Sequence, residues 1–170
     1  PLEPLDHGFD LAVAGEGEAT AVALAGAVDR GTAATTDAWT RIPGLAWRDG
    51  PRAHQNPRPA PVTDLDALAS PADALDLFDP AWYGRRGPAS FGGTLASRGC
   101  PSACTFCCNA VTGRTFRAHS PERVADEARR LRDEQQTPAF AFFDDSFALD
   151  SRRVLQLTAA LERVEGIHWT

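Results

Sequence analysis

All four cysteines of this 170-residue chain lie within nine positions, in the stretch SRGCPSACTFCCN at residues 97–109. Cys100, Cys104 and Cys107 have the spacing C-x3-C-x2-C. Three thiolates this close on one loop can each ligate one iron of a four-iron cluster, and the fourth iron is then left without a protein ligand. A metal site with an open position is suited to chemistry, whereas a closed four-ligand site is suited to structure.

Two other uses of these cysteines stay open. A zinc site could take all four, but Cys107 and Cys108 are adjacent, and neighbouring residues rarely fit one tetrahedron. A ferredoxin-like electron carrier would need a fourth ligand, for which Cys108 is poorly placed. These points favour three ligands over four. Clustered thiols in a chain with no visible signal peptide also favour a reducing cytoplasm over a disulfide framework.

Composition excludes several broad classes of protein. Hydrophobic residues make up 43 % of the chain, which is enough for a packed core. No apolar run is long enough for a membrane span. The net charge is −6, so there is no broad basic footprint for nucleic acid. The chain begins with Pro1 and contains no methionine, from which we expect a fragment or a processed piece.

The elements around the cysteines alternate between strand and helix. Residues 93–97 form a candidate strand that ends at the cysteine loop. Ser120 and Pro121 are typical of a helix start, as N-cap and first helical residue. The apolar run at residues 139–143 predicts a parallel strand buried on both faces. A second helix is expected near Ser151, with Val154, Thr158 and Leu161 on its core face, and a third strand begins at residue 167. The order β–loop–α–β–α–β places function at the carboxyl ends of the strands.

The N-terminal segment has its own strand–turn–helix pattern. Residues 10–14 predict a strand, GEGEAT a glycine turn, and residues 20–28 a helix, as in α/β folds. Thr20 stands where a dinucleotide-binding G-x-G-x-x-G motif needs its last glycine, so that motif fails. Residues 45–48 followed by Asp-Gly predict a small β-hairpin. Residues 64–80 read as a linker that packs on a neighbouring domain through its leucines.

The stretch CPSACTFC after a first strand resembles the signature of the radical S-adenosylmethionine (SAM) superfamily. In that family the open iron of a [4Fe–4S] cluster binds SAM, and reductive cleavage of SAM releases a 5′-deoxyadenosyl radical. The resemblance implies that Cys100, Cys104 and Cys107 are the cluster ligands. It also implies that Phe106, the aromatic residue before the third cysteine, lies near the adenine of SAM.

Asp144 and Asp145 follow the second predicted strand in the stretch FFDDSFALD. This stretch is similar to an acidic motif in the cobalamin-linked branch of the superfamily, where the end of this strand faces SAM. A carboxylate there can accept hydrogen bonds from the SAM ammonium or ribose. The alternative is an acidic turn that precedes the next helix, with Asp150 as its cap.

A second resemblance covers most of the chain. DLAVAGEGEAT, then IPGLAWRDG, then the leucine–aspartate linker resemble the domain junction of cobalamin-binding radical SAM proteins. The resemblance implies an α/β fold in three parts. Residues 1–35 would be the tail of a Rossmann-like cobalamin-binding domain, residues 36–90 a linker with a β-hairpin, and residues 91–170 the first βα units of an incomplete TIM-type (β/α)6 barrel.

Within this junction, Gly15, Glu16 and Gly17 are the local candidates to approach the nucleotide tail of cobalamin. The base-off cobalamin signature D-x-H-x-x-G is absent, because the stretch Asp6-His7-Gly8 does not match it.

The expected function is therefore reductive cleavage of SAM followed by cobalamin-dependent methyl transfer, with no side chain assigned as catalytic. The expected partners are a small-molecule or peptide substrate and an electron donor such as flavodoxin or ferredoxin, without membrane or nucleic acid. A cobalamin-independent enzyme, such as an RNA methylthiotransferase, is one alternative. A non-catalytic iron–sulfur carrier and a zinc-binding module are the others. The fragment alone is not expected to be active.

Overall fold

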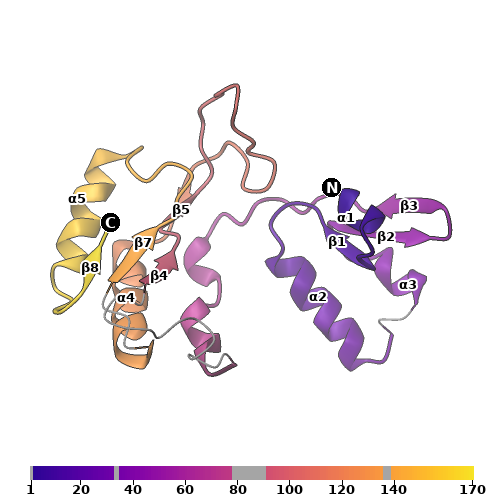
Figure 1. The fold of residues 1–170 in the computed structure, drawn as a ribbon, viewed down its shortest axis with the longest axis horizontal. Coiled ribbons are helices and arrows are strands. Elements are labelled where there is room, and N and C mark those ends of the chain that lie inside the picture. The colour runs from indigo at the N-terminus through magenta and orange to yellow at the C-terminus, as the bar shows by residue number, and fades with distance from the viewer. Residues whose placement is uncertain (1, 33–34, 78–90, 136–138) are drawn as a thin grey trace. The chain divides into compact units, whose positions relative to one another are not determined.

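The computed structural model describes residues 2–32, 35–77, 91–135 and 139–170, and Figure 1 follows the chain through its elements. The chain forms two compact units. The N-terminal unit contains Pro1–Val62 and Phe106–Gly113, and the C-terminal unit contains Thr63–Thr105 and Arg114–Thr170. Part of the predicted linker, residues 78–90, lies outside the described residues. The three predicted segment boundaries stay predictions.

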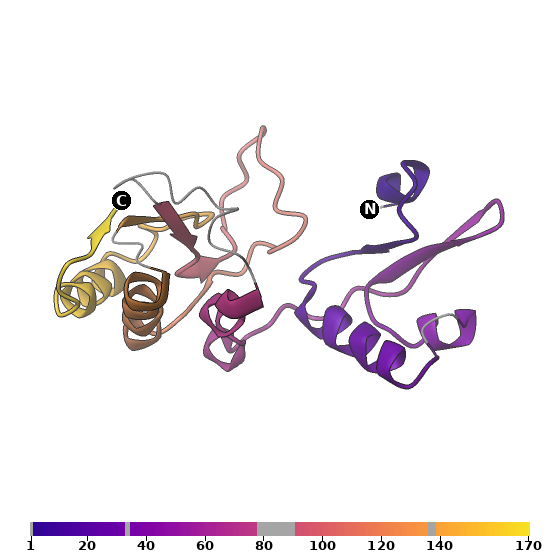
Figure 2. The same cartoon turned by 60° about the horizontal axis from the view of Figure 1, so that its bottom comes forward.

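The N-terminal unit is built on a three-stranded antiparallel sheet of order β1-β2-β3. The predicted hairpin is confirmed: β2 pairs with β3, and Gly50 takes a positive φ of 55° at the turn. Two helices, α2 and α3, cover one side of the sheet (Figure 2) around the buried Ile42, Leu45 and Trp47. The elements are α1 (Glu3–Asp6), β1 (Leu11–Val13), α2 (Glu18–Asp29), α3 (Thr36–Trp39), β2 (Leu45–Asp49) and β3 (Arg52–Gln55).

Hydrogen bonds join the GEGEAT turn between β1 and α2 to residues before and after the β2–β3 hairpin. The buried Glu16 carboxylate accepts a hydrogen bond from the Val62 N–H at 2.7 Å. The Thr20 hydroxyl, fully buried, donates to the Pro43 carbonyl at 2.7 Å. Buried polar groups need such partners, so these contacts stabilise the turn. The motif therefore has a structural use within this unit.

The C-terminal unit has a parallel sheet whose strand order β4-β7-β8 follows the chain. The crossover helices α4 and α5 therefore lie on the same face of the sheet (Figure 2). Val124 and Ala128 of α4 pack with Phe140 of β7 and with Leu157 and Leu161 of α5. These elements are β4 (Phe91–Thr94), α4 (Pro121–Gln135), β7 (Ala139–Phe142), α5 (Ser151–Leu161) and β8 (His168–Trp169).

Three details differ from the sequence-based expectations. The strand predicted over residues 93–97 is split, because β4 ends at Thr94 and β5 (Ser97–Arg98) pairs instead with β6 (Arg117–Ala118). The strand predicted over residues 139–143 is β7 and ends one residue earlier, at Phe142; Phe140 and Ala141 on its two faces are buried as predicted, and Phe143 beyond it is 64 % exposed. The core face of α5 carries Leu157, Ala160 and Leu161 rather than Val154 and Thr158, which are only partly buried.

The predicted helix caps are confirmed. The Ser120 hydroxyl accepts from the Arg123 N–H at 3.2 Å, and Pro121 is the first residue of α4. At α5 the Asp150 carboxylate accepts from the N–H groups of Arg152 and Arg153. Such caps satisfy donors that a helix leaves unpaired in its first turn.

Opposite the helices, the Phe143 ring lies over Gly93 of β4. A Cβ at position 93 would overlap this ring. A side chain at position 93 would therefore require the exposed Phe143 ring to move, and the backbone conformation itself does not call for glycine.

The linker around Ser70 contacts α4 through a stripe of polar side chains. Its short helices are η1 (Leu65–Ala67) and η2 (Pro71–Leu77). Arg123 donates to the Leu68 carbonyl at 3.0 Å, and Arg130 pairs with Asp73 at 2.6 Å. Between them, the buried Glu127 carboxylate accepts from the Ser70 hydroxyl at 2.9 Å and from the Thr94 hydroxyl. Of the linker leucines, Leu65 is 1 % exposed and Leu77 is 77 % exposed, and packing of the leucines on a neighbouring domain stays a prediction.

Candidate metal centre and cofactor site

The cysteine loop, residues 99–116, begins and ends at paired backbone. Ser97 pairs with Ala118 and Arg98 with Arg117 across β5 and β6. Gly99 follows with a φ of +82°, a left-handed conformation that glycine adopts without strain. The chain therefore turns sharply into the loop one residue before Cys100.

Asp144 and Asp145 bind the segment that leads into this loop, residues 96–99, which we call the base of the loop. Asp144 Oδ1 accepts from the Ala96 N–H at 2.8 Å, and its other oxygen accepts from the Ser97 hydroxyl. Asp145 Oδ2 accepts from the Gly99 N–H at 2.9 Å. Because β4 and β7 are parallel neighbours, their carboxyl ends meet at one edge of the sheet, and this places the two carboxylates at the loop.

The two aspartates differ in their surroundings. Burial raises the pKa of Asp144 above its ordinary value, and the hydrogen bond from Ser97 opposes that rise. Asp145 is exposed, so a ligand at the loop can reach it. Asp144 is therefore the buried acceptor for protein groups, and Asp145 is the aspartate that a cofactor can reach more easily.

The tip of the loop, residues 101–108, is exposed throughout. None of the four cysteines forms a disulfide; Cys100 is half-buried and the other three are exposed. Phe106 is 91 % exposed. Within the N-terminal unit, Arg58 donates to the Ala110 carbonyl at 2.8 Å, and the Cys107 thiol donates to the Asn109 side chain at 3.1 Å. The tip thus offers thiols and an aromatic ring that no packing covers.

The donor set fits a soft metal or an iron–sulfur cluster. Hydrogen bonds from the Ser102 N–H and hydroxyl lower the pKa of the Cys100 thiol. A lower pKa favours the thiolate, which is the form that ligates metal.

No three of the His, Cys, Asp and Glu side chains in the described part of the chain come together to hold a metal ion. The assignment of Cys100, Cys104 and Cys107 as ligands therefore stays a prediction. An exposed loop has little packing to order it, and metal binding itself can supply the free energy that orders the ligands.

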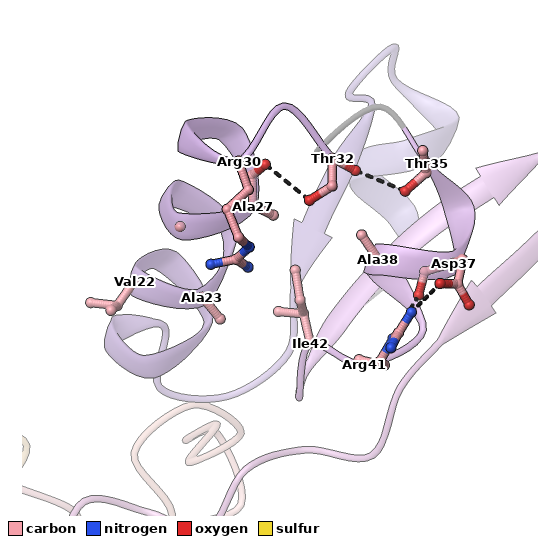
Figure 3. Close-up of a pocket in the computed structure, with 11 residues that line it drawn as sticks. Val22, Ala23, Ala27, Arg30, Thr32, Thr35, Asp37, Ala38, Arg41 and Ile42 are labelled. Atoms are coloured by element: carbon pink, nitrogen blue, oxygen red, sulfur yellow. Dashed lines mark hydrogen bonds and ion pairs between the residues drawn. The ribbon is translucent and has the colours of Figure 1, made fainter.

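The remaining predicted residues, Gly15, Glu16 and Gly17, lie in the N-terminal unit. A hollow of about 440 Å³ in that unit lies between α2 and α3 (Figure 3) and does not include them among its lining residues. Apolar Val22 and Ile42 share this lining with Arg30 and an exposed Asp37–Arg41 ion pair. None of the residues that line the hollow is a predicted cluster ligand or cofactor-binding residue.

Arg153 is the residue of this site that sequence reasoning missed. Its side chain is 8 % exposed, and its Nη2 donates to the Ala96 carbonyl at 2.5 Å. A charged residue in the first turn of a helix is normally expected to face solvent, so no sequence signal indicated its burial. Ser97, also missed, is 1 % exposed beside Asp144.

Comparison with known proteins gives one family match and several relatives. Residues 94–170 match the family model of the Radical SAM superfamily. An uncharacterised methyltransferase of Pyrococcus horikoshii is 31 % identical over 165 residues, which cover 95 % of this chain and 34 % of that protein. Hopanoid C-3 methylase of Methylococcus capsulatus is 30 % identical over 168 residues, which cover 96 % of this chain and 29 % of that protein. The chain thus spans about a third of the length of these curated relatives.

Among solved structures, the chain is similar to TsrM from Kitasatospora setae, a radical S-adenosylmethionine methyltransferase. The structure with tryptophan substrate and a SAM analogue bound has a TM-score of 0.62 and 22 % identity, covering 95 % of this chain and 30 % of that one. A second structure, with cobalamin and a [4Fe–4S] cluster bound, has a TM-score of 0.60. The likeness shows that the chain shares this mixed α/β fold.

Proposed function

The chain belongs to the radical SAM superfamily through residues 94–170, and on this basis we propose that the protein is an enzyme that reductively cleaves SAM in order to transfer a methyl group. The observation that carries the proposal is the C-x3-C-x2-C loop, which lies within the matched residues, follows the parallel strand β4 and the short strand β5, and has an exposed tip. Two relatives that match nearly the whole chain are named as a methyltransferase and a methylase.

In this proposal Cys100, Cys104 and Cys107 hold a [4Fe–4S] cluster, which when bound supplies the electron for SAM cleavage. Phe106 provides an uncovered ring for the adenine. The exposed Asp145 accepts hydrogen bonds from the polar end of SAM. Asp144 contributes indirectly, because it holds the backbone at the base of the loop by accepting a hydrogen bond from the Ala96 N–H.

The same proposal assigns the two units to parts of a larger architecture. A parallel sheet in chain order, with both crossover helices on one face, supports the start of a TIM-type (β/α)6 barrel over residues 91–170. Residues 1–35 are proposed as the tail of a Rossmann-like cobalamin-binding domain, and residues 36–90 as the linker. The strand–turn–helix connection of β1 and α2 supports this, although β1 itself pairs antiparallel with β2.

Cobalamin is proposed as a further cofactor because the junction motifs resemble those of cobalamin-binding members and because one similar structure has cobalamin bound. Gly15 and Gly17 remain the proposed points of approach to it. The Glu16 carboxylate bonds to the Val62 N–H, so we assign Glu16 to shaping the turn.

The proposed partners are a small-molecule or peptide substrate and an electron donor such as flavodoxin or ferredoxin, in the cytoplasm. In the described residues, no helix is both long enough and apolar enough to span a bilayer.

The decisive test compares Cys104→Ala with Cys108→Ala after anaerobic reconstitution. Both thiols are exposed, so neither change disturbs packing. We expect Cys104→Ala to lose cluster iron and the formation of 5′-deoxyadenosine from SAM, whereas Cys108→Ala keeps both. Transfer of a labelled SAM methyl group, with and without added cobalamin, then tests the reaction class.

Each alternative has its own result in this experiment. Zinc in place of iron after anaerobic purification would favour the zinc-binding module. A cluster without SAM cleavage would favour the electron carrier. Cluster content and cleavage unchanged in Cys104→Ala would overturn the ligand assignment.

A further inference from the structure

The backbone of Ala96 is bound on both sides by charged side chains of opposite sign. Its N–H donates to Asp144 at 2.8 Å, and its carbonyl accepts from Arg153 Nη2 at 2.5 Å. The same carbonyl accepts from the His119 N–H at 3.0 Å. Ala96 is fully buried, so water does not compete for these groups. Residues far apart in sequence therefore converge on one residue, four positions before Cys100.

Arg153 occupies an unfavourable position for a cation. Its Nε and Nη1 atoms are buried and, among the described residues, have no hydrogen-bond partner. It is the third residue of α5, near the end where the helix dipole is positive. Burying a charge is costly unless an opposite charge compensates it. Burial lowers the pKa of Arg153, and the negative charges of Asp144 and Asp150 oppose that shift. The Phe116 ring centroid lies 6.0 Å from the guanidinium carbon.

We propose that Asp144 and Arg153 form a two-sided clamp on Ala96, the Ala96 clamp, whose role is to fix the direction in which the chain enters the cysteine loop. Asp145 extends the hold to the Gly99 N–H, directly before Cys100. Asp144 and Arg153 are then positioning residues for the first cluster ligand, and neither touches SAM. The inference rests on the proposed function for its purpose, but the clamp itself is a property of the protein without cofactor.

A purely stabilising pair would predict something different. Such a pair would change the free energy of unfolding and leave the cluster in the folded protein unaltered. The clamp predicts local loosening of residues 96–99 and a changed cluster environment in protein that is still folded.

The first experiment measures amide hydrogen exchange of Ala96 and Gly99 in the cofactor-free protein. We expect Arg153→Gln to speed exchange at these two amides by about tenfold or more, while amides in the core of α4 keep their protection. Arg152→Gln is the matched control, because Arg152 is the exposed neighbour in the same turn, and it should exchange like wild type.

If Arg153→Gln does not fold, Arg153→Lys provides the same measurement, since it keeps the charge and loses the planar fork of donors. Faster exchange at Ala96 supports the clamp. Wild-type exchange rates at Ala96 and Gly99 in folded Arg153→Gln or Arg153→Lys would overturn it.

The second experiment asks whether the two side chains act together. If they form one clamp, the double variant Asp144→Asn/Arg153→Gln should exchange no more than about twofold faster than the worse single variant, because the effects of residues that share a partner, here Ala96, are not additive. If the increases in exchange rate of the two single variants multiply in the double variant, the two contacts are independent and the clamp is overturned.

The third measurement is the electron paramagnetic resonance spectrum of the reduced, reconstituted protein. We expect Arg153→Gln to retain iron but to give a shifted or broadened signal, with Arg152→Gln matching wild type. An unchanged spectrum in a variant with loosened residues 96–99 would overturn the positioning role. If the wild type itself takes up no cluster, the proposed function fails, and the exchange data still decide the clamp.

Discussion

The base and the tip of the cysteine loop are built in opposite ways. At the base, residues 96–99, Ala96, Ser97 and Gly99 are buried, and their polar groups bond to Asp144, Asp145 and Arg153. At the tip, residues 101–108, every residue is exposed. The protein thus fixes where the loop starts and leaves the thiols uncovered.

Residues 96–108 are continuous in the sequence, but the contrast divides them into residues of the base and residues of the tip. Residues at the base should matter for stability before any cofactor binds. Residues at the tip should matter for cofactor binding and hardly at all for stability. The predictions below use substitutions that test each half of that statement.

The largest contrast is expected between two phenylalanines. Phe140, 1 % exposed under the base, should cost about 3–5 kcal/mol of unfolding free energy when changed to alanine, because a core cavity is left. Phe106→Ala at the tip should change that free energy by no more than about 0.5 kcal/mol, yet raise the KM for SAM. Denaturant unfolding and SAM-cleavage kinetics provide the two readouts. Equal losses of stability would contradict the contrast.

The next effect concerns the buried Glu127 carboxylate, which binds Thr94 at the end of β4 and Ser70 in the linker. Glu127→Ala leaves both hydroxyls without this acceptor and should cost about 2–3 kcal/mol of unfolding free energy. Glu127→Gln keeps the shape and one carbonyl oxygen, so it should cost less. An equal loss in the two variants would mean that volume, and not hydrogen bonding, explains the effect.

A smaller difference is expected between two glycines with positive φ. Gly99 has a φ of +82° at the buried base, and Gly113 has a φ of +75° in the loop's exit, with open space around it. Gly99→Ala should cost about 1–2 kcal/mol of unfolding free energy, because the left-handed backbone is held by its surroundings. Gly113→Ala should cost less, since that segment can relax. The reverse order in thermal or denaturant unfolding would contradict a fixed base.

The smallest expected effect is a pH dependence in the linker. Hydrogen bonding from Arg130 holds the pKa of Asp73 below its ordinary value of 3.8. A lowered pKa means that Asp73 stabilises the folded chain above that value and loses this contribution as the pH falls through the lowered pKa. Asp73→Asn should therefore be less stable than wild type at neutral pH and converge with it in acid. A gap that stays constant between about pH 7 and about pH 3 would count against this interpretation.

Much of the C-terminal unit was predictable because its signals are local. Ser120-Pro121 and Asp150 mark helix starts through contacts within one turn, and the apolar run before Asp144 marks a buried strand. The Asp-Gly pair likewise predicted the hairpin. The candidate ligands could be proposed only as residue types, because the C-x3-C-x2-C spacing says nothing of their geometry, and their role stays a prediction.

What the sequence could not indicate depends on residues distant in the chain. The split between β4 and β5 arises because the Ala96 N–H bonds to Asp144, 48 positions away, and not to a neighbouring strand. The buried Arg153 side chain bonds to the Ala96 carbonyl, 57 positions away. The linker's polar stripe joins Ser70 to Glu127 over 57 positions. Periodicity and capping rules do not extend over such separations.

The overlap between a side chain at position 93 and the Phe143 ring has a consequence for sequence diversity. Two positions that compete for one volume should vary together during evolution. Homologues with an aromatic residue at 143 should keep glycine at 93, and those with a small residue at 143 should tolerate alanine or serine at 93. An alignment of this family would therefore carry a paired signature on the sheet face away from the helices.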